Sequence, residues 1–294
     1  MINDKKMFWI SSYPKSGNTW LRLILCGLFF TEDGNLNNFD LLKKIPGFDS
    51  LKNFSFVKEK SLKDYDIIFN GTEYNEESVL TYSKYWIEAQ KRISIDKGKF
   101  GLFKTHNARV KINNNYYTDS SITLGFIYIS RDPRDIVISY SKHINKNIDE
   151  TIRFLLDGQI MKKEKIGNKM PEIILNWRDH YLSWKKFSEV PSLFLKYEDM
   201  LNNIELEVQK IKNFFYKNYN IKITNESSKI KNIIKSTKFD NLKKKEFQYG
   251  FPEHSHSTFF RIGQQKQWSK ILNQKQIEAI EKKFKNQLIE LNYI

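Results

Sequence analysis

Short apolar runs and amphipathic stretches alternate along most of this chain. Four runs have the length and the content of β-branched and aromatic residues typical of buried strands, at residues 7–11, 100–106, 123–132 and 192–200. Strands that alternate with helices predict a parallel sheet with helices on both faces. The expected fold is therefore α/β, with three layers and a central, mostly parallel sheet.

Apolar residues at helical spacing predict the helices between and after these strands. We expect them at residues 18–30, 78–91, 148–159 and 172–187, from Pro133, up to about Ser236, and in a last helix with Ile277, Ile280, Phe284, Leu288 and Leu291 on one face. Residues 31–98 are irregular and rich in Asn, Asp and Lys, so we expect a partly helical insertion that covers a site. The lysines at 243–245 are expected in a solvated turn.

Composition narrows the class of protein. With 294 residues, 40% hydrophobic content and no repeat or Pro/Gly-rich linker, the chain is expected to form a single domain over residues 1–294. The net charge of +15 favours anionic partners, although a biased genome would also enrich Lys, Asn and Ile. The single cysteine, Cys26, excludes an intramolecular disulfide and fits a reducing compartment. No early apolar run is long enough for a signal peptide or a membrane span, so a cytoplasmic protein without stable membrane insertion is expected.

The segment SSYPKSGNTW, residues 11–20, joins the first strand to the first helix. A loop of this kind presents unpaired backbone N–H groups at the positive end of the helix dipole. Lys15 adds a positive charge and Gly17 lets the backbone approach a ligand, while Ser16 and Thr19 add hydroxyl donors. We therefore expect the segment to hold a phosphate group, with an ordinary strand–turn–helix connection as the alternative.

The loop differs from the nucleotide-triphosphatase pattern G-x-x-x-x-G-K-[ST], because its lysine precedes its glycine. A magnesium-binding carboxylate at a strand end has only Asp132 as a candidate. A P-loop nucleotide kinase or NTPase stays an alternative function, and it would need ATP and magnesium. A non-enzymatic polyanion-binding protein is a further alternative that rests on net charge alone, and no nucleic-acid-binding motif supports it.

Two more strand ends carry charged or titratable side chains. His106 ends the second strand with Lys104 on the same face, and Arg131 follows the apolar run of the third strand. In sheets of this kind ligands bind beyond the carboxyl ends of the strands. Lys15, His106 and Arg131 are therefore expected to meet at one edge of the sheet.

These segments resemble, in order, the motifs of sulfotransferases that use 3′-phosphoadenylyl sulfate (PAPS). YPKSGNTW is similar to the family's 5′-phosphosulfate loop, YISRDPRDIVISYSKH to its 3′-phosphate motif, and FKTH to the strand with its catalytic histidine. FLKYEDM, and FFRIG followed by W, match its later blocks. The resemblance runs from Trp9 to about Tyr293, is weakest over residues 31–98 and is nearest to the bacterial branch. It implies one sulfotransferase domain with a three-layer P-loop-like fold.

The resemblance also implies which residues bind the donor PAPS and its product, adenosine 3′,5′-bisphosphate (PAP). The 5′-phosphosulfate would be held by Lys15, Ser16, Gly17, Asn18, Thr19 and Trp20. The remainder of the nucleotide, including its 3′-phosphate, would be held by Arg131, Ser139, Tyr197, Thr237, Phe239, Phe260, Arg261 and Gly263. No metal is implied, because a cationic side chain can stabilise the charge that develops in sulfuryl transfer.

For some of these residues the sequence leaves a second role open. A salt bridge to Asp132 or Asp135 is the alternative for Arg131. Core positions are the alternative for the two aromatic residues, Trp20 and Phe239. The neighbouring Arg134 is expected to face solvent.

The catalytic residues implied by the resemblance are His106, Lys15 and Lys104. His106 would be the general base that takes the acceptor's proton, since the pKa of a histidine suits that task near neutrality. Lys15 would stabilise negative charge on the bridging oxygen as the sulfuryl group leaves. Lys104 would help to neutralise the developing charge.

The chain departs from the family pattern in its last third. Ile262 replaces the lysine of the family's R-K-G block, and whether Lys266 restores that charge is left open. Only Glu278 survives of the family's K-x-x-x-T-V-x-x-x-E dimer motif, so the oligomeric state is also left open. His254 and His256 have no third ligand at a recognisable spacing, which favours a loop near the active-site mouth over a metal site.

The expected function is in-line transfer of a sulfuryl group from PAPS to a hydroxyl or amine of a small-molecule or glycan acceptor. The acceptor would contact residues 31–98 and residues near 251–260, where Tyr85, Trp86 and Phe251 allow a flat or amphipathic molecule. The sequence does not identify the acceptor, and no nucleic-acid partner is expected.

Overall fold

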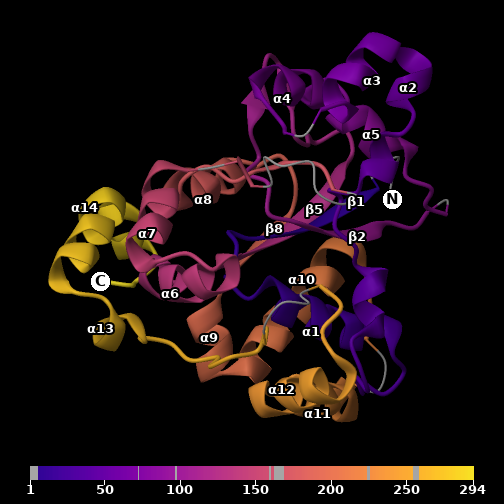
Figure 1. Cartoon of the computed structure of the whole chain (residues 1–294). Coiled ribbons are helices and arrows are strands. Elements are labelled where there is room, and N and C mark those ends of the chain that lie inside the picture. Colours follow the sequence, from indigo (N-terminus) through magenta and orange to yellow (C-terminus); the bar gives the residue numbers. More distant parts are fainter. Residues whose placement is uncertain are drawn as a thin grey trace. The chain divides into compact units, whose positions relative to one another are not determined.

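The computed structural model describes residues 6–71, 73–96, 98–158, 160–161, 169–223, 226–253 and 258–294. Its main sheet has the hydrogen-bonded strand order β2-β1-β5-β8 (Figure 1). These strands are β1 (Met7–Ser11), β2 (Gly101–Thr105), β5 (Thr123–Ser130) and β8 (Ser192–Lys196). β1 runs parallel to both β2 and β5, and its Ser11 lies opposite Thr105 and Tyr128. The four predicted strands and the predicted parallel α/β fold are therefore confirmed.

Burial and capping explain where these strands lie and end. Every residue of β1 and of β5 is buried, as expected for strands that are covered on both faces. Two strands are shorter than predicted. β5 ends before Asp132, whose side chain accepts the Arg134 backbone N–H and caps a helix that starts at Pro133. β8 ends where the helix α9 (Tyr197–Asn202) begins.

The chain forms two compact units, and their boundaries cut through β5 and β8. The first unit contains Met1–Tyr13, Gly47–Tyr128 and Phe154–Ser192. The second unit contains Pro14–Pro46, Ile129–Arg153 and Leu193–Ile294. The single domain that the sequence predicts stays a prediction.

The first unit contains β1, β2, most of β5 and most of the predicted insertion, which is largely helical. Its further elements are η2 (Leu51–Phe54), α2 (Val57–Lys60), α3 (Leu62–Phe69), α4 (Glu76–Ser83), α5 (Trp86–Arg92), β3 (Lys111–Ile112), β4 (Asn115–Tyr116), β6 (Ile160–Met161), β7 (Glu172–Ile173) and α8 (Trp177–Lys185). Its core is aromatic: the ring of Trp9 in β1 lies 5.6 Å from that of Phe48 and 5.5 Å from that of Tyr117. These rings pack one face of the sheet against the insertion.

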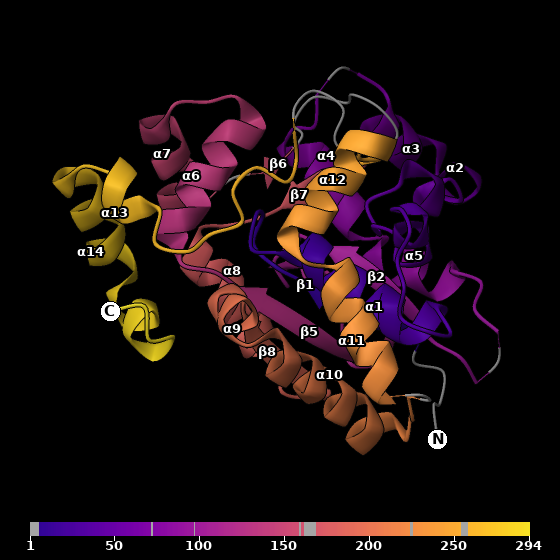
Figure 2. The ribbon, with the colours of Figure 1, turned by 90° about the horizontal axis from the view of Figure 1, so that it is seen from below.

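The second unit is mainly helical. Its elements are α1 (Asn18–Phe30), η1 (Asp40–Lys44), α6 (Pro133–Ile144), α9, α10 (Ile204–Tyr219), α11 (Glu226–Ser236), α12 (Phe239–Tyr249), α13 (Trp268–Ile271) and α14 (Gln274–Glu290); α7 (Ile148–Asp157) crosses the boundary. Figure 2 shows α11 beside α1 and α10, and α13 and α14 beside α6. The last helix buries Ile280, Phe284 and Leu288, the centre of its predicted apolar face.

Three sequence predictions of secondary structure were wrong in detail. The helix predicted at 78–91 is divided into α4 and α5 around Tyr85, whose hydroxyl donates to Asp64 at 2.8 Å. The helix predicted at 172–187 begins only at Trp177, because Asn176 caps it and the preceding residues pair as β7. The lysines at 243–245 lie inside α12, which is amphipathic and buries Leu242.

Candidate active site

The Lys15 loop, residues 14–17, connects β1 to α1 in the second unit. Lys15 has φ 67° and Gly17 has φ 99°, so two left-handed residues flank Ser16 at the start of the helix. Such an alternation turns successive backbone N–H groups toward one point and suits an anion. The Ser16 hydroxyl is fully buried and has no hydrogen-bond partner among the described residues. The loop therefore has both the conformation and an unused donor that an anion site needs.

Tyr197, the first residue of α9, connects the Lys15 loop with Arg131. A Cβ atom on Gly17 would stand 2.7 Å from Cδ2 of the Tyr197 ring, so the ring can approach only a glycine. The guanidinium carbon of Arg131 lies 4.3 Å from the centre of the same ring. Trp20 meets the ring edge-on, with centroids 5.6 Å apart. The residues predicted at the two ends of the nucleotide thus share one aromatic contact.

Arg131 directs its guanidinium toward backbone carbonyls instead of carboxylates. Nη1 donates to the Lys15 carbonyl at 3.1 Å and Nη2 to the Gln264 carbonyl at 3.0 Å. Its Nε is buried without a hydrogen-bond partner among the described residues. No ion pair to Asp132 or Asp135 occurs in the described part of the chain, so the predicted alternative role of Arg131 is not observed. A buried guanidinium that keeps an unused donor is suited to an oxyanion.

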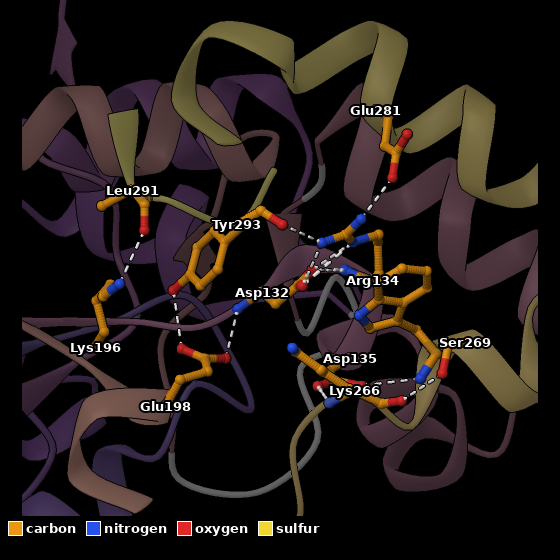
Figure 3. A network of polar contacts seen from close by, with 11 residues as sticks. Asp132, Arg134, Asp135, Lys196, Glu198, Lys266, Ser269, Glu281, Leu291 and Tyr293 are labelled. Atoms are coloured by element: carbon orange, nitrogen blue, oxygen red, sulfur yellow. Dashed lines mark hydrogen bonds and ion pairs between the residues drawn. The ribbon is translucent and has the colours of Figure 1, made fainter. Parts of the chain in front are cut away.

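Asp132 is instead held by Arg134, and the prediction that Arg134 faces solvent was wrong. Arg134 is 2% exposed and donates to Asp132 Oδ2 at 2.7 Å, Glu281 at 2.5 Å and the Tyr293 carbonyl at 2.8 Å (Figure 3). The Asp132 backbone N–H donates to Glu198 at 3.0 Å, and the Tyr293 hydroxyl donates to the other oxygen of Glu198 at 3.1 Å. This network fixes the turn that carries Arg131 to α9, α14 and the last residues of the chain.

Most of the residues predicted around the 3′-phosphate lie together with Phe239, which was predicted to lie against the adenine. Nη2 of Arg261 donates to the Ser139 carbonyl at 2.9 Å. Gly263 has φ 65°, and a Cβ atom there would collide with the Phe239 ring. Phe260 is 7% exposed and lies edge-on to Phe239 with centroids 6.3 Å apart. The structure therefore brings Ser139, Phe239, Phe260, Arg261 and Gly263 into one cluster of the second unit.

Most of the other residues predicted to bind PAPS lie at the ends of helices. Asn18 and Thr19 are buried in the first turn of α1. Thr237 is 1% exposed, and its hydroxyl donates to the Ile233 carbonyl at 2.8 Å at the end of α11. Ile262 is 49% exposed. The backbone N–H of Lys266 donates to Asp135 at 2.7 Å, which ties this segment to α6.

Phe259 is a residue of this site that the sequence reasoning missed. The ammonium nitrogen of Lys15 lies 4.1 Å from the centre of the Phe259 ring. Phe259 stacks in turn on Phe251 with centroids 4.3 Å apart, and Phe251 lies edge-on to Phe39 at 5.1 Å. A cation held over a ring is partly desolvated and positioned. The signal was its place beside Phe260 in the FFRIG block.

Among the described residues there is no group of three or more His, Cys, Asp or Glu side chains placed to hold a metal ion. His254 and His256 lie outside the described residues. No helix in the described part of the chain is long and apolar enough to cross a membrane.

His106 follows β2 in the first unit, where its imidazole is fixed to the residue after β1. Its Nδ1 lies 2.8 Å from the Ser12 carbonyl oxygen and 3.2 Å from the Ser12 hydroxyl. A carbonyl oxygen only accepts, so Nδ1 carries the proton and the basic lone pair of the neutral ring is on Nε2. The backbone N–H of His106 donates to Glu172 at 3.1 Å. This tautomer is the one that a general base acting through Nε2 requires.

Other predicted residues of the first unit have plainer surroundings. Lys104 is half-buried two residues before His106 and pairs with Ile10 across the sheet. Trp86 is fully buried and lies edge-on to Tyr82 at 5.5 Å and to Tyr117 at 5.5 Å. Two of the aromatic residues named for the acceptor, Trp86 here and Phe251 in the second unit, therefore pack within aromatic clusters.

Comparison with known proteins identifies the family. A family model described as the sulfotransferase domain matches residues 5–292, almost the whole chain. The chain belongs to the sulfotransferase family. This confirms the resemblance that its motifs suggested.

Curated sulfotransferases from animals and plants align with the chain. Sulfotransferase 1B1 from Canis lupus familiaris is 27% identical over 286 residues, 95% of this chain and 82% of the relative. Flavonol 3-sulfotransferase from Flaveria bidentis is 24% identical over 93% of this chain and 79% of the relative. Sulfotransferase 1E1 from Bos taurus is 27% identical over 80% of this chain, and the match spans 65% of the relative.

Solved sulfotransferase-family structures have the same fold. Mouse sulfotransferase SULT7A1 complexed with PAP matches with a TM-score of 0.57 and 18% identity, covering 97% of this chain and 84% of that one. Retinol dehydratase in complex with androsterone and inactive cofactor PAP matches with a TM-score of 0.62 and 18% identity, over 96% and 80% of the two chains. The predicted P-loop-like α/β fold of the sulfotransferase family is thereby confirmed.

Proposed function

We propose that this sulfotransferase-family chain transfers a sulfuryl group from PAPS to a hydroxyl or amine of a small-molecule acceptor and releases PAP. The observation that carries the proposal is the pair of anion sites in the second unit that share the Tyr197 ring. The first offers the buried Ser16 hydroxyl and the second the buried Nε of Arg131, both without a partner among the described residues. Two anion sites beside one another fit a donor with phosphate groups at both ends.

The names of the relatives support the donor and the acceptor class. Two solved structures of the family are complexes with PAP. Curated relatives are named for flavonols and for amines, which are small molecules with a nucleophilic oxygen or nitrogen. These names favour a small-molecule acceptor over a glycan.

The proposed chemistry assigns one role to each charged group. The acceptor oxygen attacks sulfur while the bond between sulfur and the bridging oxygen of PAPS breaks. The acceptor's proton passes to Nε2 of His106, which the Ser12 carbonyl keeps unprotonated. PAP leaves with a new negative charge, which Lys15 stabilises and Lys104 helps to neutralise. The Phe259 ring positions Lys15, whose ammonium nitrogen lies 4.1 Å from the ring centre.

The test is to incubate the chain with PAPS and a panel of phenols, alcohols and amines, and to measure PAP by mass spectrometry. Acceptor-dependent release of PAP is the expected result. Isothermal titration should show PAP binding that does not depend on magnesium. A larger thermal stabilisation by ATP with magnesium than by PAP, together with ATP hydrolysis, would establish the nucleotide kinase or NTPase alternative.

A further inference from the structure

A closed ring of hydrogen bonds surrounds His106 in the first unit. Nε2 of His180, in α8, lies 3.1 Å from the His106 carbonyl oxygen, and its Nδ1 lies 2.9 Å from the Tyr128 hydroxyl. The Tyr128 hydroxyl accepts a hydrogen bond from the backbone N–H of Tyr13. The carbonyl of that same peptide bond, on Ser12, accepts Nδ1–H of His106. The chain of contacts thus returns to the residue from which it started.

Each proton in the ring has one possible place. The carbonyl of His106 only accepts, so Nε2 of His180 carries a proton and its Nδ1 accepts from the Tyr128 hydroxyl. The Tyr128 hydroxyl is thus the donor to His180 Nδ1, while its oxygen accepts from the Tyr13 N–H. The Ser12 carbonyl accepts the hydrogen bond of His106 Nδ1–H. The tautomer of each histidine is therefore set by the carbonyl that it meets, that of Ser12 for His106 and that of His106 for His180.

The two side chains of the ring that support His106 are buried, and His180 is neutral. His180 is fully buried and Tyr128 is 1% exposed. Burial lowers the pKa of His180 from 6.5 to about 3, so the ring keeps its neutral form over the range in which a general base works. The titratable groups that face it are Tyr13, Tyr128 and Tyr181 among the aromatic rings, and Glu172 at the His106 backbone N–H.

Helix α8 is the rigid support of this arrangement. One turn after His180 on the same helix face, the indole N–H of Trp184 donates to the Asn107 carbonyl at 3.0 Å. The side chain of Asn107 in turn accepts the Ile173 backbone N–H at 2.8 Å. Two successive carbonyls after β2 are thus bound by one helix, which fixes the backbone that carries the His106 ring.

We propose that His180 is a positioning residue for the base His106. Its Nε2–H holds the His106 carbonyl, and through Tyr128 and the Ser12–Tyr13 peptide it keeps the Ser12 carbonyl in place to accept from His106 Nδ1. This rests on the proposed function, since it assigns His180 to the base of that reaction. His180 itself touches neither donor nor acceptor in this proposal.

The experiment compares His180→Phe, which keeps an aromatic ring but removes both hydrogen bonds, with His180→Gln, whose side-chain amide can still donate to the His106 carbonyl. Hydrogen-bond partners that orient a metal-ligating histidine are worth about 10- to 100-fold, and we expect a loss of that order in kcat/KM for His180→Phe. His180→Gln should recover most of it. The KM for PAPS and the Kd for PAP should stay unchanged, because the residues proposed to bind the donor belong to the second unit.

A second readout separates positioning from structure and from activity. Nitrogen-15 NMR of labelled histidines in the full chain should show His106 as the Nδ1–H tautomer in the wild type and as a tautomer mixture in His180→Phe. The acid limb of the kcat/KM pH profile should shift with it. Thr118→Val is the matched control: Thr118 is fully buried in the same unit and hydrogen-bonded to Trp9 and Gln90, outside the ring. It should lower stability without moving the tautomer or the pH profile.

Each outcome decides the proposal. An unchanged tautomer and pH profile in His180→Phe, or an equal change in Thr118→Val, overturns it. If His180→Phe does not fold, Tyr128→Phe, which removes only the hydroxyl, decides by the same NMR measurement. A wild type that shows the expected tautomer but no sulfuryl transfer from PAPS contradicts the proposed function and leaves the hydrogen-bonded ring established.

Discussion

The Lys15 loop with Arg131 and the surroundings of His106 differ in how their polar groups are bonded. In the second unit, Ser16, Trp20 and Arg131 each keep a buried donor atom without a partner among the described residues. In the first unit, the backbone and side chain of His106 are bound at the N–H, the carbonyl and Nδ1. Buried donors without partners cost free energy unless a ligand satisfies them. We infer that the unpaired donor atoms of Ser16 and Arg131 are available to the anionic groups of PAPS, whereas the hydrogen bonds around His106 hold the base in place.

This contrast also explains why the same residue types have different roles. Arg131 and Arg134 are three residues apart in chain order and both buried, yet Arg134 is saturated by Asp132, Glu281 and the Tyr293 carbonyl. Arg131 donates to two neutral carbonyls, and Asp135 and Glu198 act on its charge without forming an ion pair with it among the described residues. Arg134 therefore builds the turn, and Arg131 is the one suited to an anion.

The largest effects are expected for the proposed base, His106, and for Lys15, which is proposed to stabilise the leaving group. His106→Ala should lower kcat/KM by roughly 10²- to 10⁴-fold, the range of general-base catalysis, without changing the Kd for PAP. Lys15→Ala should lower turnover by a similar order. Steady-state kinetics and titration with PAP measure both quantities. Lys243→Ala, on the exposed side of α12, is the control and should have wild-type kinetics. Near-normal turnover of both active-site variants would contradict the assigned roles.

A change at Arg131 should act on affinity. Arg131→Gln removes the charge beside the Tyr197 ring, and the loss of a charge-assisted contact of about 1.5–3 kcal/mol should weaken PAP binding by roughly 10- to 100-fold. Arg153→Gln removes the same charge from an exposed position in α7 and is the matched control. Calorimetric Kd values that rise equally in both variants would show that net charge, and not this site, binds the nucleotide.

Gly17→Ala tests the close approach of Tyr197. The added Cβ meets the Tyr197 ring at 2.7 Å in a left-handed backbone of φ 99°, so we expect a loss of about 1–3 kcal/mol in unfolding free energy and about tenfold weaker PAP binding. Gly250→Ala is the control, because Gly250 has φ 70° and a Cβ atom added there would have no neighbouring atom within 4 Å. Gly250→Ala should lose only the unfolding free energy that comes from placing alanine in a left-handed backbone, and it should keep its PAP affinity. Equal losses of PAP affinity would show that the ring contact does not matter.

Much of the second unit's site could be predicted from sequence, because its residues lie in short contiguous motifs. Lys15 to Trp20 form one loop and helix start, and Arg131 and Ser139 share one turn and helix. Tyr197, which joins them in space, was found only through the family resemblance. Periodicity also located α1 and β5, since both bury continuous apolar runs.

The surroundings of His106 could not be predicted in the same way. His180 and Glu172 are far from His106 in sequence, and their contacts with it use backbone groups that carry no sequence signal. The helix predicted from residue 172 would also have placed Glu172 on a helix. It belongs instead to β7, because Asn107 and Ala108 pair with Ile173 and hold this segment extended. Backbone pairing overrode the helical pattern there.

The pH dependence of stability tests whether His180 is held neutral. Burial lowers the pKa of His180 from 6.5 to about 3, so between these pH values the unfolded chain binds a proton that the folded chain excludes. The free energy of unfolding should therefore fall by about 1.4 kcal/mol for each pH unit below 6.5, and be unaffected by this group above it. Urea unfolding of wild type and His180→Phe measures the difference in slope. Identical slopes would show that His180 is not held neutral.

The smallest effect is expected in the hydrogen-bond network of the second unit, whose polar groups already have protein partners. Tyr293→Phe removes the hydroxyl that donates to Glu198 at 3.1 Å, while the Tyr293 carbonyl still accepts from Arg134. Because Glu198 keeps the Asp132 N–H, the expected loss is that of this hydrogen bond and of the longer one with the Ser130 hydroxyl at 3.4 Å, about 1–2 kcal/mol of unfolding free energy. The Kd for PAP should change by less than about threefold, since Arg131 keeps its own partners. A large loss of PAP affinity would mean that the turn carrying Arg131 needs every contact of this network. Polar groups with protein partners would then matter to PAP binding as much as the unpaired donors.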